Sequence, residues 1–590
     1  MPMTPTDFFK LNKSKYGQSF RLLANTSNKL SFVRLTVFLI LVSLIILLSS
    51  YTNLTVITLS SVLGLMLFIR LVSYHKDIDN KKQFHKTLQE LNIEELDRIS
   101  GHLPENRDGE RFTKRESFFA SDLDLFGEKS LFHQVNRCYL PVSQEKLADL
   151  LTTPVSKSEI EHRHHLLNDL ESQIDWVQEY IATLKLHSTK VKEHPNLDFL
   201  SSLKPQAHIR WTAWLLRILS LTAIGLFITG YLPFFVILIM AVINYSIMTY
   251  YARDLFSAGV KSDILIRHIN VHVQAMMKIY QRKFTSEAVD ALTANISEKT
   301  IKEVFALEKI VRWLNSRANP IYGILNAFLL IDLFSFQRLA EWVKRNYNKL
   351  GNWFDTVYEM EMYCSLAAWK FHNPDYIIPE FSDSPCQFDA KDLGHPLIDK
   401  KEVVKNDFSF DQAAIYLVTG SNMSGKSTFL RTVGLNVLMA WTGLPVYAVY
   451  FKTSRFILFT SMRTQDNLAE NTSSFYAELK RIKRLFALID ESKYPVLFFL
   501  DEILKGTNSD DRHTGSRGIV EKLLKKNCIG FISTHDLQLA DEYQDHPMIE
   551  NISFNSHLED GRLIFDYKLT EGKCHSTNAT LLMRSMDILD

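Results

Sequence analysis

Four long apolar runs limit what this chain can fold into more than any other feature. Residues 32–51 and 54–74 form one closely spaced pair, and residues 211–230 and 232–251 form a second. Each run holds about 20 residues, enough for a helix to cross a hydrocarbon core of about 30 Å. The sequence therefore predicts two membrane hairpins separated by a long polar segment.

The charges inside these runs are few and mostly lie near the ends. Arg34 and Arg70 lie close to the ends of their runs, where a long side chain can reach the interface. Arg217 lies about two turns inside the third run, so that span either starts later than residue 211 or relies on the same reach. Interfacial aromatic residues flank the second pair: Trp211, Trp214, Tyr245, Tyr250 and Tyr251.

Basic residues set the predicted orientation. They gather on the outer flanks of both pairs, whereas the tips around Asn53 and Gly230 carry no charge. The flanking residues are Lys10, Lys13, Lys15, Arg21, Lys29, Arg34, His75, Lys76, Lys81, Lys82, Lys204, Arg210 and Arg253. The positive-inside rule then predicts a multi-pass protein of the cytoplasmic (inner) membrane with both termini in the cytoplasm.

Two alternatives bear on the membrane prediction. The first pair is too long and starts too late for a cleaved signal peptide, but the runs also fit buried core hairpins of a soluble protein. A further run at 320–334 contains Asn326 and Asp332, and we expect it to be a buried helix of the soluble part rather than a fifth span.

Composition says little about function and bears mainly on the redox state of the compartment. The chain has 67 basic and 66 acidic residues, so no overall excess argues for nucleic acid. The five cysteines contain no CxxC pair, which favours reduced thiols in a cytosolic compartment over ligands or disulfides. They are Cys138, Cys364, Cys386, Cys528 and Cys574.

The polar segments divide by texture. Residues up to about 390 have helical patterning, as in LQELNIEELDRI. From about Lys391, short strand-like runs (AAIYLVTG, RFILFT, YPVLFFLDE, CIGFISTHD) alternate with helical stretches, which indicates a parallel α/β sheet. The predicted divisions are a tail with the first hairpin (1–75), a helical part (76–208), the second hairpin (209–252), a second helical part (253–385) and an α/β domain (386–590).

A phosphate-binding loop opens the α/β domain. GSNMSGKS at 420–427 fits G-x-x-x-x-G-K-[ST], follows the strand-like AAIYLVT and precedes a helical stretch. Gly420 and Gly425 let the backbone wrap around phosphate, Lys426 should reach the β and γ phosphates, and the Ser427 hydroxyl should ligate Mg²⁺. The predicted nucleotide-binding residues are Gly420, Ser421, Asn422, Met423, Ser424, Gly425, Lys426, Ser427 and Thr428.

Two later strand ends supply the remaining chemistry. Asp501 and Glu502 end an apolar run, and we assign Asp501 to the metal and Glu502 to the general base or water positioning. His535 follows the next strand-like run, where it can bond the γ-phosphate or its water. Taken alone, the acids would be an ordinary solvated strand end and the histidine a structural residue. Behind a complete phosphate loop, both patterns favour ATP hydrolysis, with Glu502, His535 and Lys426 as catalytic residues.

Together these residues resemble the MutS family of ABC-type ATPases. GSNMSGKST resembles that family's GPNMGGKST, and LDEILKGTNSDD resembles its DEIGRGTSTYDG. SMRTQDNLAENTSSFYAELK, GHPLID and TGLPVYA are similar to further family segments. Upstream, 130–163 and 353–381 are similar to the opening of the family's core domain and the end of its lever helices. The implied fold is mixed, with transmembrane helices, all-α core and lever helices and a C-terminal α/β P-loop ATPase domain.

The resemblance implies a head-to-tail homodimer that sandwiches ATP and Mg²⁺. The loop of Gly506, Thr507, Asn508 and Ser509 would then act on the partner's phosphates, so Asn508 and Ser509 join the predicted nucleotide-binding residues. Asp466 and Glu478 lie in the segment that links the site to the levers. ATP binding would close the dimer and hydrolysis would open it, and the levers would carry that motion away from the site.

The departures from the family pattern shape the functional hypothesis. The Phe-x-Glu segment that reads mismatches has no counterpart, since membrane runs stand in that region. Residues 76–114 are too few for the connector domain. Val403 stands about where the family often has an adenine-stacking aromatic residue, and Ser424 replaces a loop glycine.

Three functions follow from these features. The first is a membrane-anchored MutS-like ATPase dimer that binds DNA at the inner membrane face without mismatch specificity, using basic clusters at 480–484 and 522–526. The second is an ABC-type mechanochemical ATPase that acts on a membrane or protein partner without DNA. The third, a transporter, is disfavoured because the LSGGQ-type signature is absent.

Overall fold

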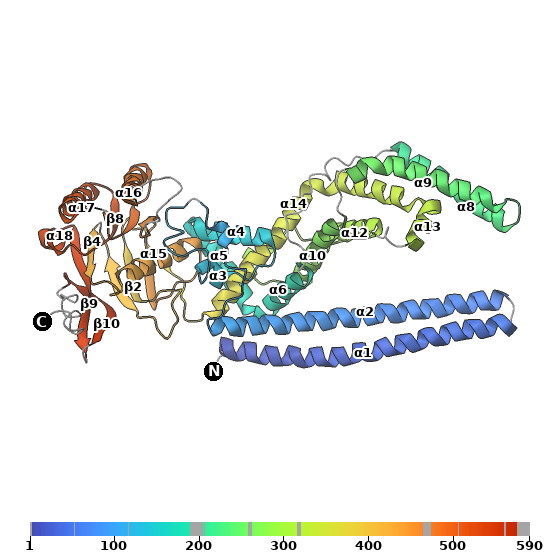
Figure 1. The fold of residues 1–590 in the computed structure, drawn as a ribbon, viewed down its shortest axis with the longest axis horizontal. Coiled ribbons are helices and arrows are strands. Elements are labelled where there is room, and N and C mark those ends of the chain that lie inside the picture. Colours follow the sequence, from blue (N-terminus) through green and yellow to red (C-terminus); the bar gives the residue numbers. More distant parts are fainter. Residues whose placement is uncertain are drawn as a thin grey trace. The chain divides into compact units, whose positions relative to one another are not determined.

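The computed structural model describes residues 3–51, 54–115, 117–188, 205, 207–257, 262–315, 320–412, 414–463, 474–505, 507–559 and 562–574 (Figure 1). Contacts divide the chain into two compact units, each assembled from separate stretches of sequence. The first holds Met1–Ser100, Arg137–Gln144 and Ser172–Ser365, and the second holds Gly101–Asn136, Glu145–Glu171 and Leu366–Asp590. The predicted domain boundaries stay predictions, because this division follows contacts rather than sequence texture.

The first unit is helical throughout its described residues. Its helices are α1 (Pro5–Tyr51), α2 (Leu54–Ile99), α6 (Ile174–Ser188), α8 (Ala207–Ile228), α9 (Phe234–Ser257), α10 (Ser262–Tyr280), α11 (Glu287–Thr293), α12 (Glu298–Asn315), α13 (Pro320–Leu329) and α14 (Ile331–His372), with the start of α4 (Pro141–Thr152) and the end of α14 shared with the second unit.

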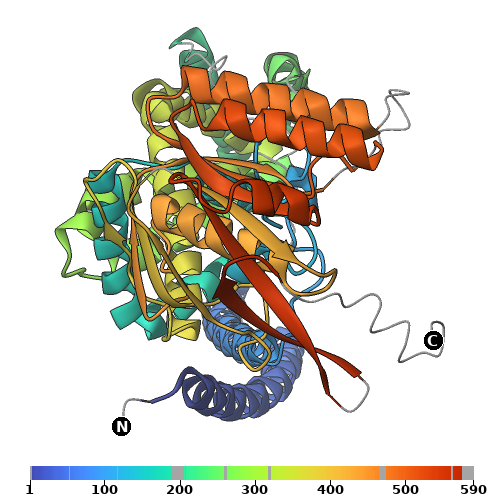
Figure 2. The same ribbon diagram turned by 90° about the vertical axis from the view of Figure 1, so that its left-hand side faces the viewer.

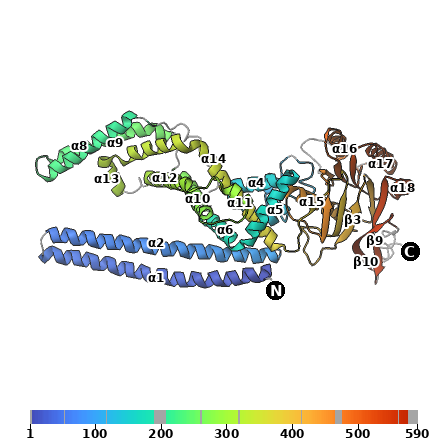
Figure 3. The same cartoon turned by 180° about the vertical axis from the view of Figure 1, so that it is seen from behind.

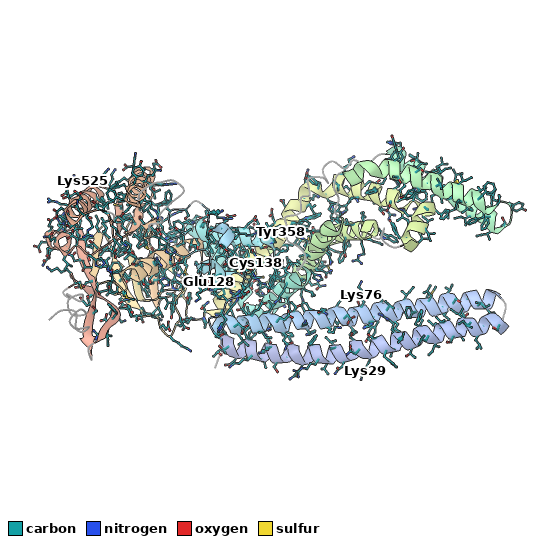
Figure 4. All side chains as sticks on the ribbon, viewed as in Figure 1. Lys29, Lys76, Glu128, Cys138, Tyr358 and Lys525 are labelled. Carbon is teal, nitrogen blue, oxygen red and sulfur yellow. The ribbon has the colours of Figure 1, made fainter. Side chains whose placement is uncertain are left out.

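Helices α1 and α2 form a long hairpin that contains the first two apolar runs. The polar tail before residue 32 is helical and continuous with the run that follows. Lys29 and Lys76 lie at the same level of the two helices, next to the apolar stretches (Figure 4). Beyond that level most large apolar side chains are exposed on both helices. Residues 52 and 53, the predicted tip, lie outside the described residues.

In the described part of the chain, three helices are long and apolar enough to cross a membrane. They are Pro5–Leu48, His208–Ile228 and Phe234–Tyr251, and of their most apolar stretches 0%, 17% and 11% are buried. Apolar helices that stay this exposed need hydrocarbon or a partner to cover them.

Residues 320–334 form two elements rather than one buried helix. Helix α13 meets α14 at a bend of 77°, with Leu330 in the left-handed region at φ 47°. Asn326 and Asp332 are buried as expected, but Ile324 and Leu325 on α13 are exposed. Helix α13 lies beside α8 and α9 in both Figure 1 and Figure 3.

The second unit is built on two sheets, as the alternating texture predicts. The larger has the order β10 (Arg562–Glu571), β9 (Ile549–Glu559), β4 (Ile415–Gly420), β8 (Cys528–Thr534), β7 (Val496–Asp501) and β6 (Ile457–Ser461), and all neighbours are parallel except β10 and β9. The smaller has the order β1 (Glu380–Phe381), β5 (Tyr450–Thr453), β2 (Phe388–Leu393) and β3 (Asn406–Phe410). The helical and α/β parts of the predicted fold class are confirmed.

The larger sheet is apolar on both faces because helices cover both. Phe498 and Leu500 of β7 pack in a cluster with α16 (Ser474–Glu491) and α17 (Ser509–Leu523). Figure 2 shows these two helices together on one side of the sheet. Phe499 faces the other way and stacks on Phe531 of β8, whose ring also meets Phe429 of α15 (Lys426–Thr442). The short helix α18 (Leu537–Glu542) follows β8.

Part of the predicted helical segment 76–208 packs with the α/β domain instead. Helix α5 (Lys157–Ser172) belongs mostly to the second unit. Apart from α3 (Leu131–Val135) and the turn Glu110–Phe112, the stretch 101–136 is irregular in its described residues. Its buried Asp122 accepts hydrogen bonds from Thr460 Oγ1 (2.7 Å), from the backbone N–H groups of Met462 and Arg463 (3.1 Å each) and from Arg481 (3.0 Å). One carboxylate thus fixes the end of β6 to α16.

Candidate nucleotide-binding site

The site forms where three neighbouring parallel strands end. Strand β4 runs into the phosphate loop, β7 ends at Asp501 and β8 ends at Thr534, just before His535. The register places Thr419 opposite Thr534 and Asp501 opposite Ser533. Because the carboxyl ends of parallel strands share one edge of a sheet, segments distant in sequence meet there.

The loop glycines are required by space and by backbone angle. Gly420 has φ 152°, and a Cβ there would lie 2.7 Å from both Phe554 O and Ser424 Oγ. Gly425 has φ 106° and opens α15. Met423 also has a positive φ, 67°, and its side chain is 84% exposed at the tip of the loop. The loop is therefore held in one wrapped conformation, with backbone N–H groups available to an anion.

Lys426 is buried beneath this loop. Its ammonium donates to Gly420 O (2.8 Å) and Ser421 O (3.0 Å). Burial lowers the pKa of Lys426, and the carboxylates of Glu502 and Asp501 partly offset this shift. An anion in the loop would favour the charged form further. Ser424 Oγ is fully buried and has no hydrogen-bond partner among the described residues, so a polar ligand would also satisfy it.

Ser427 and Asp501 form the candidate magnesium pair. The Ser427 hydroxyl donates to Asp501 Oδ2 at 2.6 Å, and the Ser533 hydroxyl donates to Asp501 Oδ1. A hydroxyl and a carboxylate are oxygen ligands that suit Mg²⁺, which usually takes its other ligands from phosphate and water. Within the described ranges no group of three or more His, Cys, Asp or Glu side chains could hold a metal ion by itself. The residues therefore fit a nucleotide-bound Mg²⁺.

Glu502 is held in a strained backbone conformation beside the loop. Its φ is 51°, and its N–H donates to Ser533 O at 3.1 Å. Its carboxylate meets Lys505 Nζ at 2.7 Å and His535 Nε2 at 3.0 Å. Burial raises the pKa of Glu502, but the hydrogen bonds and charges of Lys505 and His535 outweigh it, so the net shift is downward. The carboxylate is therefore ionised near neutral pH, as a base must be.

His535 joins the base to the phosphate loop. Its Nε2 lies 2.9 Å from Asn422 Oδ1 as well as 3.0 Å from Glu502 Oε1. Both neighbours are acceptors, so this nitrogen carries the proton and donates to them. The structure thus brings together, in one site, the sequence-predicted Lys426, Ser427, Asp501, Glu502 and His535, along with Asn422 of the loop.

The sequence-predicted residues Asn508 and Ser509 stand apart from this cluster. Asn508 caps α17, with Oδ1 accepting from Asp511 N at 2.8 Å, and Ser509 Oγ meets Asp510. Neither lines the pocket in the described part of this chain. Their predicted role toward a partner's phosphates stays a prediction. Gly506 and Asp466 lie outside the described residues.

Glu478 lies on α16 and contacts the turn after β7 that carries Glu502 and Lys505. Its Oε1 accepts the Leu504 N–H at 2.5 Å, and Leu504 also has a positive φ, 60°. Burial raises the pKa of Glu478, although the N–H groups and the Lys505 charge oppose that shift. This contact fixes the strained turn that carries Glu502 and Lys505.

A pocket of about 590 Å³ extends from the phosphate loop past β2 and β3. That volume lies within the range of small-molecule sites. Its lining also includes Ile398, Val403, His395 and Tyr567, and the Tyr567 ring lies next to Gly425 of the phosphate loop. Burial, with a smaller contribution from Arg431, lowers the pKa of His395 to about 4, so its ring is neutral. Its Nδ1 accepts the Leu397 N–H at 3.2 Å, which leaves Nε2 as a donor.

Ser533, Lys505, His395 and Tyr567 were missed by sequence reasoning. Ser533 and Lys505 directly flank predicted residues, so strand parity and spacing could have suggested them. Tyr567 is different, because it is brought to the pocket by sheet order. Asn406 of β3 donates to Tyr567 O (3.1 Å) and accepts from Leu569 N (2.9 Å), which docks the bulge of β10 beside the loop. No local pattern signals this long-range contact.

Comparison with known proteins places these elements in a family context. Residues 416–583 match the family model of MutS domain V. The chain is 30% identical over 236 residues to MutS protein homolog 4 of Homo sapiens, covering 38% of this chain and 24% of that protein. It is 30% identical over 241 residues to the DNA mismatch repair protein MutS of Thermotoga sp. (strain RQ2), covering 40% and 30%.

The MutS protein of Staphylococcus haemolyticus is 28% identical over 268 residues, covering 44% of this chain and 30% of that protein. The chain thus spans between about a quarter and a third of the relatives it matches. These findings show that residues 416–583 are similar to MutS domain V and that about 40% of the chain is similar to part of MutS proteins.

Proposed function

We propose that this chain is a membrane-anchored MutS-like ATPase, which hydrolyses ATP in a head-to-tail dimer and passes the motion to its helical levers. One observation carries the hydrolysis proposal. Ser427, Asp501, Glu502 and His535 converge on one phosphate loop through hydrogen bonds of 2.6–3.0 Å. ATP is the proposed substrate.

The phosphate loop and its lysine would bind and orient the triphosphate. Backbone N–H groups of the loop and the first turn of α15 face the anion, and the Lys426 ammonium neutralises the β and γ phosphates. Ser427 and Asp501 would hold Mg²⁺, which when bound neutralises the charge that builds on the phosphate oxygens. Ser533 keeps the Asp501 carboxylate in position.

Glu502 and His535 would handle the water and its proton. Glu502 accepts the proton of the attacking water, since its carboxylate is ionised and lies next to the loop. His535 Nε2–H donates to that carboxylate and can also donate to the γ-phosphate. Lys505 holds the second carboxylate oxygen, which keeps Glu502 from turning away.

The dimer would complete each site from the other side. Asn508 and Ser509 open α17, and we propose that this loop approaches the partner's nucleotide, where hydroxyl, amide and N–H donors meet the developing charge. Met423 is exposed at the tip of the phosphate loop, and we propose that the partner covers this surface.

Membrane anchoring is proposed from the exposed apolar helices α1, α8 and α9 and from the apolar start of α2. The basic residues flanking them would place the ATPase and both termini at the cytoplasmic face of the inner membrane. Lys29 and Lys76 at the same level of α1 and α2 fit the boundary between hydrocarbon and cytoplasm (Figure 4).

Two partner classes remain under this proposal, DNA and a membrane or other protein. The basic clusters favour the second. Arg481 pairs with Asp122 and Lys526 with Asp490, and Lys522 lies over the Phe486 ring at 4.1 Å. Fewer cations are therefore left for DNA phosphates than the sequence suggests. Lys525, which follows α17 and is labelled in Figure 4, is exposed.

Replacing Glu502 by Gln tests the hydrolysis proposal. Loss of the base should lower turnover by about 10²–10⁴-fold while ATP binding persists. Steady-state phosphate release and binding of a fluorescent ATP analogue measure the two effects, and Glu491→Gln at the exposed end of α16 is the matched control. Undiminished turnover in Glu502→Gln would remove Glu502 from the mechanism.

Duplex DNA binding separates the two partner classes. Phosphate contacts are strongest at low salt, so a DNA-binding chain should bind duplex in 50 mM salt and release it steeply as salt rises. Absence of binding at low salt leaves the protein-partner proposal.

A further inference from the structure

The second hairpin contains polar groups that a simple membrane anchor does not need. Arg217 lies about 10 Å inside its apolar run, and Asn244 lies at a similar depth in the following one, given a rise of about 1.5 Å per residue. Ser220 and Asn244 are 0% and 1% exposed. Polar residues inside apolar helices are costly unless they have a specific partner, so each calls for one.

Their partner is the end of α13. Arg217 Nε donates to Leu329 O at 2.7 Å, and its Nη2 donates to the same oxygen. Asn244 Nδ2 donates to Ala327 O at 2.7 Å and to Ser220 Oγ at 2.8 Å. The last carbonyls of a helix have no partner within the helix. Arg217 on α8 and Asn244 on α9 therefore cap the C-terminus of α13.

The bend after α13 is locked by side chains as well. Asn326 Nδ2 donates to Asp332 Oδ2 (2.8 Å), Asp332 N donates to Asn326 Oδ1 (2.9 Å), and the Tyr322 hydroxyl donates to Asp332 Oδ1 (2.6 Å). Leu330 sits at the 77° bend with φ 47°. All of these hydrogen bonds join residues of this chain. The polar groups that they involve at the bend between α13 and α14 are therefore satisfied by protein and not by solvent or lipid.

The outside of this assembly is apolar. Ile324 and Leu325 of α13 are 64% and 45% exposed. On α8, Trp214 packs edge-on against Phe334 of α14, and the Arg217 guanidinium lies 3.8 Å from the centroid of the same ring. Helix α13 lies beside α8 and α9 (Figure 1), and all three helices carry exposed apolar side chains.

We infer that α13 is a re-entrant half-helix, covered by lipid acyl chains and clamped in the bilayer by Arg217 and Asn244. Its 10 residues extend about 15 Å, half of a hydrocarbon core of about 30 Å. Irregular backbone is tolerated at membrane depth only when its polar groups are satisfied by protein, which the two caps and the Asn326–Asp332 lock achieve. The inference rests on the proposed membrane anchoring.

The clamp has a consequence for the motor. Helix α14 begins at Ile331, directly after the clamped bend. A movement of the start of α14 would therefore move α13 and the hairpin with it. The second hairpin acts as a joint between the lever helix and the bilayer, in addition to holding the protein at the membrane.

Depth measurements on the full chain test the lipid contact. A nitroxide is attached to Ile324→Cys in vesicles of phosphatidylethanolamine and phosphatidylglycerol. Leu221→Cys on α8 and Lys525→Cys in the turn after α17 are the controls, and each label is corrected for the parent chain with its five buried cysteines. Lipid contact gives high access to oxygen and low access to a water-soluble nickel chelate. Ile324→Cys should match Leu221→Cys.

Each other result has a definite meaning. Access like that of Lys525→Cys places α13 in water, and low access to both reagents places it against a protein or a second copy, so either overturns the inference. If the Leu221→Cys label itself is open to the nickel chelate, membrane anchoring fails rather than the inference about α13.

The clamp is tested by a second set of variants in the same background. Arg217→Ala should raise nickel access at position 324 several-fold, and Arg217→Lys, which keeps one donor, should raise it less. Arg210→Ala, which removes an exposed cation from the same helix, should leave it unchanged. Unchanged access in Arg217→Ala would overturn the role of Arg217.

Discussion

Lys426 and Arg217 have the same task in two different regions: each is a long cationic side chain that donates to backbone carbonyls. Lys426 bonds Gly420 O and Ser421 O within its own loop, whereas Arg217 bonds Leu329 O on a helix more than a hundred residues away. The first set of bonds can be exchanged for bonds to phosphate. The second caps Leu329 O at the end of α13, next to Ala327 O, which accepts from Asn244.

Their surroundings explain the difference. The carboxylates of Glu502 and Asp501 partly offset the effect of burial on the pKa of Lys426. Its surroundings therefore already contain charged groups, which suits a site where ions bind and leave. Arg217 lies over the rings of Trp214 and Phe334, which hold a cation in place without offering it a competing anion. The setting of Lys426 among titratable groups therefore suits chemistry, and the setting of Arg217, a half-buried cation among aromatic rings, suits assembly.

The strongest test of the difference between Lys426 and Arg217 is to remove each cation in turn. Lys426→Ala should lower turnover by about 10²–10³-fold, because one preorganised donor to the phosphates is lost. Arg217→Ala should leave turnover in detergent within error of the parent chain, since the residue makes no contact with the site. Phosphate release measures both. Equal losses in the two variants would mean that Arg217 supports the whole fold and that the comparison is wrong.

A smaller effect is expected at Ser533, which contacts the proposed metal ligand Asp501 and not the metal itself. Ser533→Ala removes the hydroxyl that holds Asp501 Oδ1. Loss of such a supporting bond typically weakens metal affinity by about 10–100-fold. A magnesium titration of turnover should then show a higher half-saturating concentration with a nearly unchanged maximum. Ser516→Ala, a buried serine on α17, is the control. An unchanged magnesium requirement would contradict the assignment of Asp501 to the metal.

The two regions also differ in how much could be predicted from sequence. Lys426, Ser427, Asp501, Glu502 and His535 follow strands whose parallel order brings their ends together, so motif and texture were sufficient to find them. The loop of Asn508 and Ser509 could be identified only through the family resemblance, and no contact within one chain tests it.

In the helical unit, sequence located the runs but not their contacts. The position of Arg217 suggested a shifted or snorkelling span, and 320–334 suggested a buried helix. Neither pattern reveals that the arginine caps Leu329 O, because a helix cap from another helix depends on tertiary packing. Tyr567 was missed for the same reason, since a bulge in β10 and the amide of Asn406 bring it to the pocket.

Proton affinity offers a test inside the catalytic region. Lys505→Met removes the ammonium group that lowers the pKa of Glu502. Burial then raises this pKa, and only His535 still opposes it. Glu502 works as a base only when ionised, so the acid limb of the turnover–pH profile should move to higher pH and activity at mildly acidic pH should fall. Lys505→Arg should keep the limb in place. A shift to lower pH would show that Glu502 is not the group that titrates.

The smallest effect is expected at Tyr567, an aromatic residue of the pocket lining that sequence analysis did not identify. Val403 cannot stack on a base, whereas the Tyr567 ring lines the same pocket and its backbone is fixed by Asn406. Stacking of aromatic groups contributes about 0.5–1.5 kcal/mol, so Tyr567→Ala should weaken ATP binding by about 2–10-fold and Tyr567→Phe should not. Calorimetric titration with ATP measures this. Stacking uses the face of the ring and not its hydroxyl, so equal weakening in both variants would show that Tyr567 acts through its phenol oxygen and does not stack on the base.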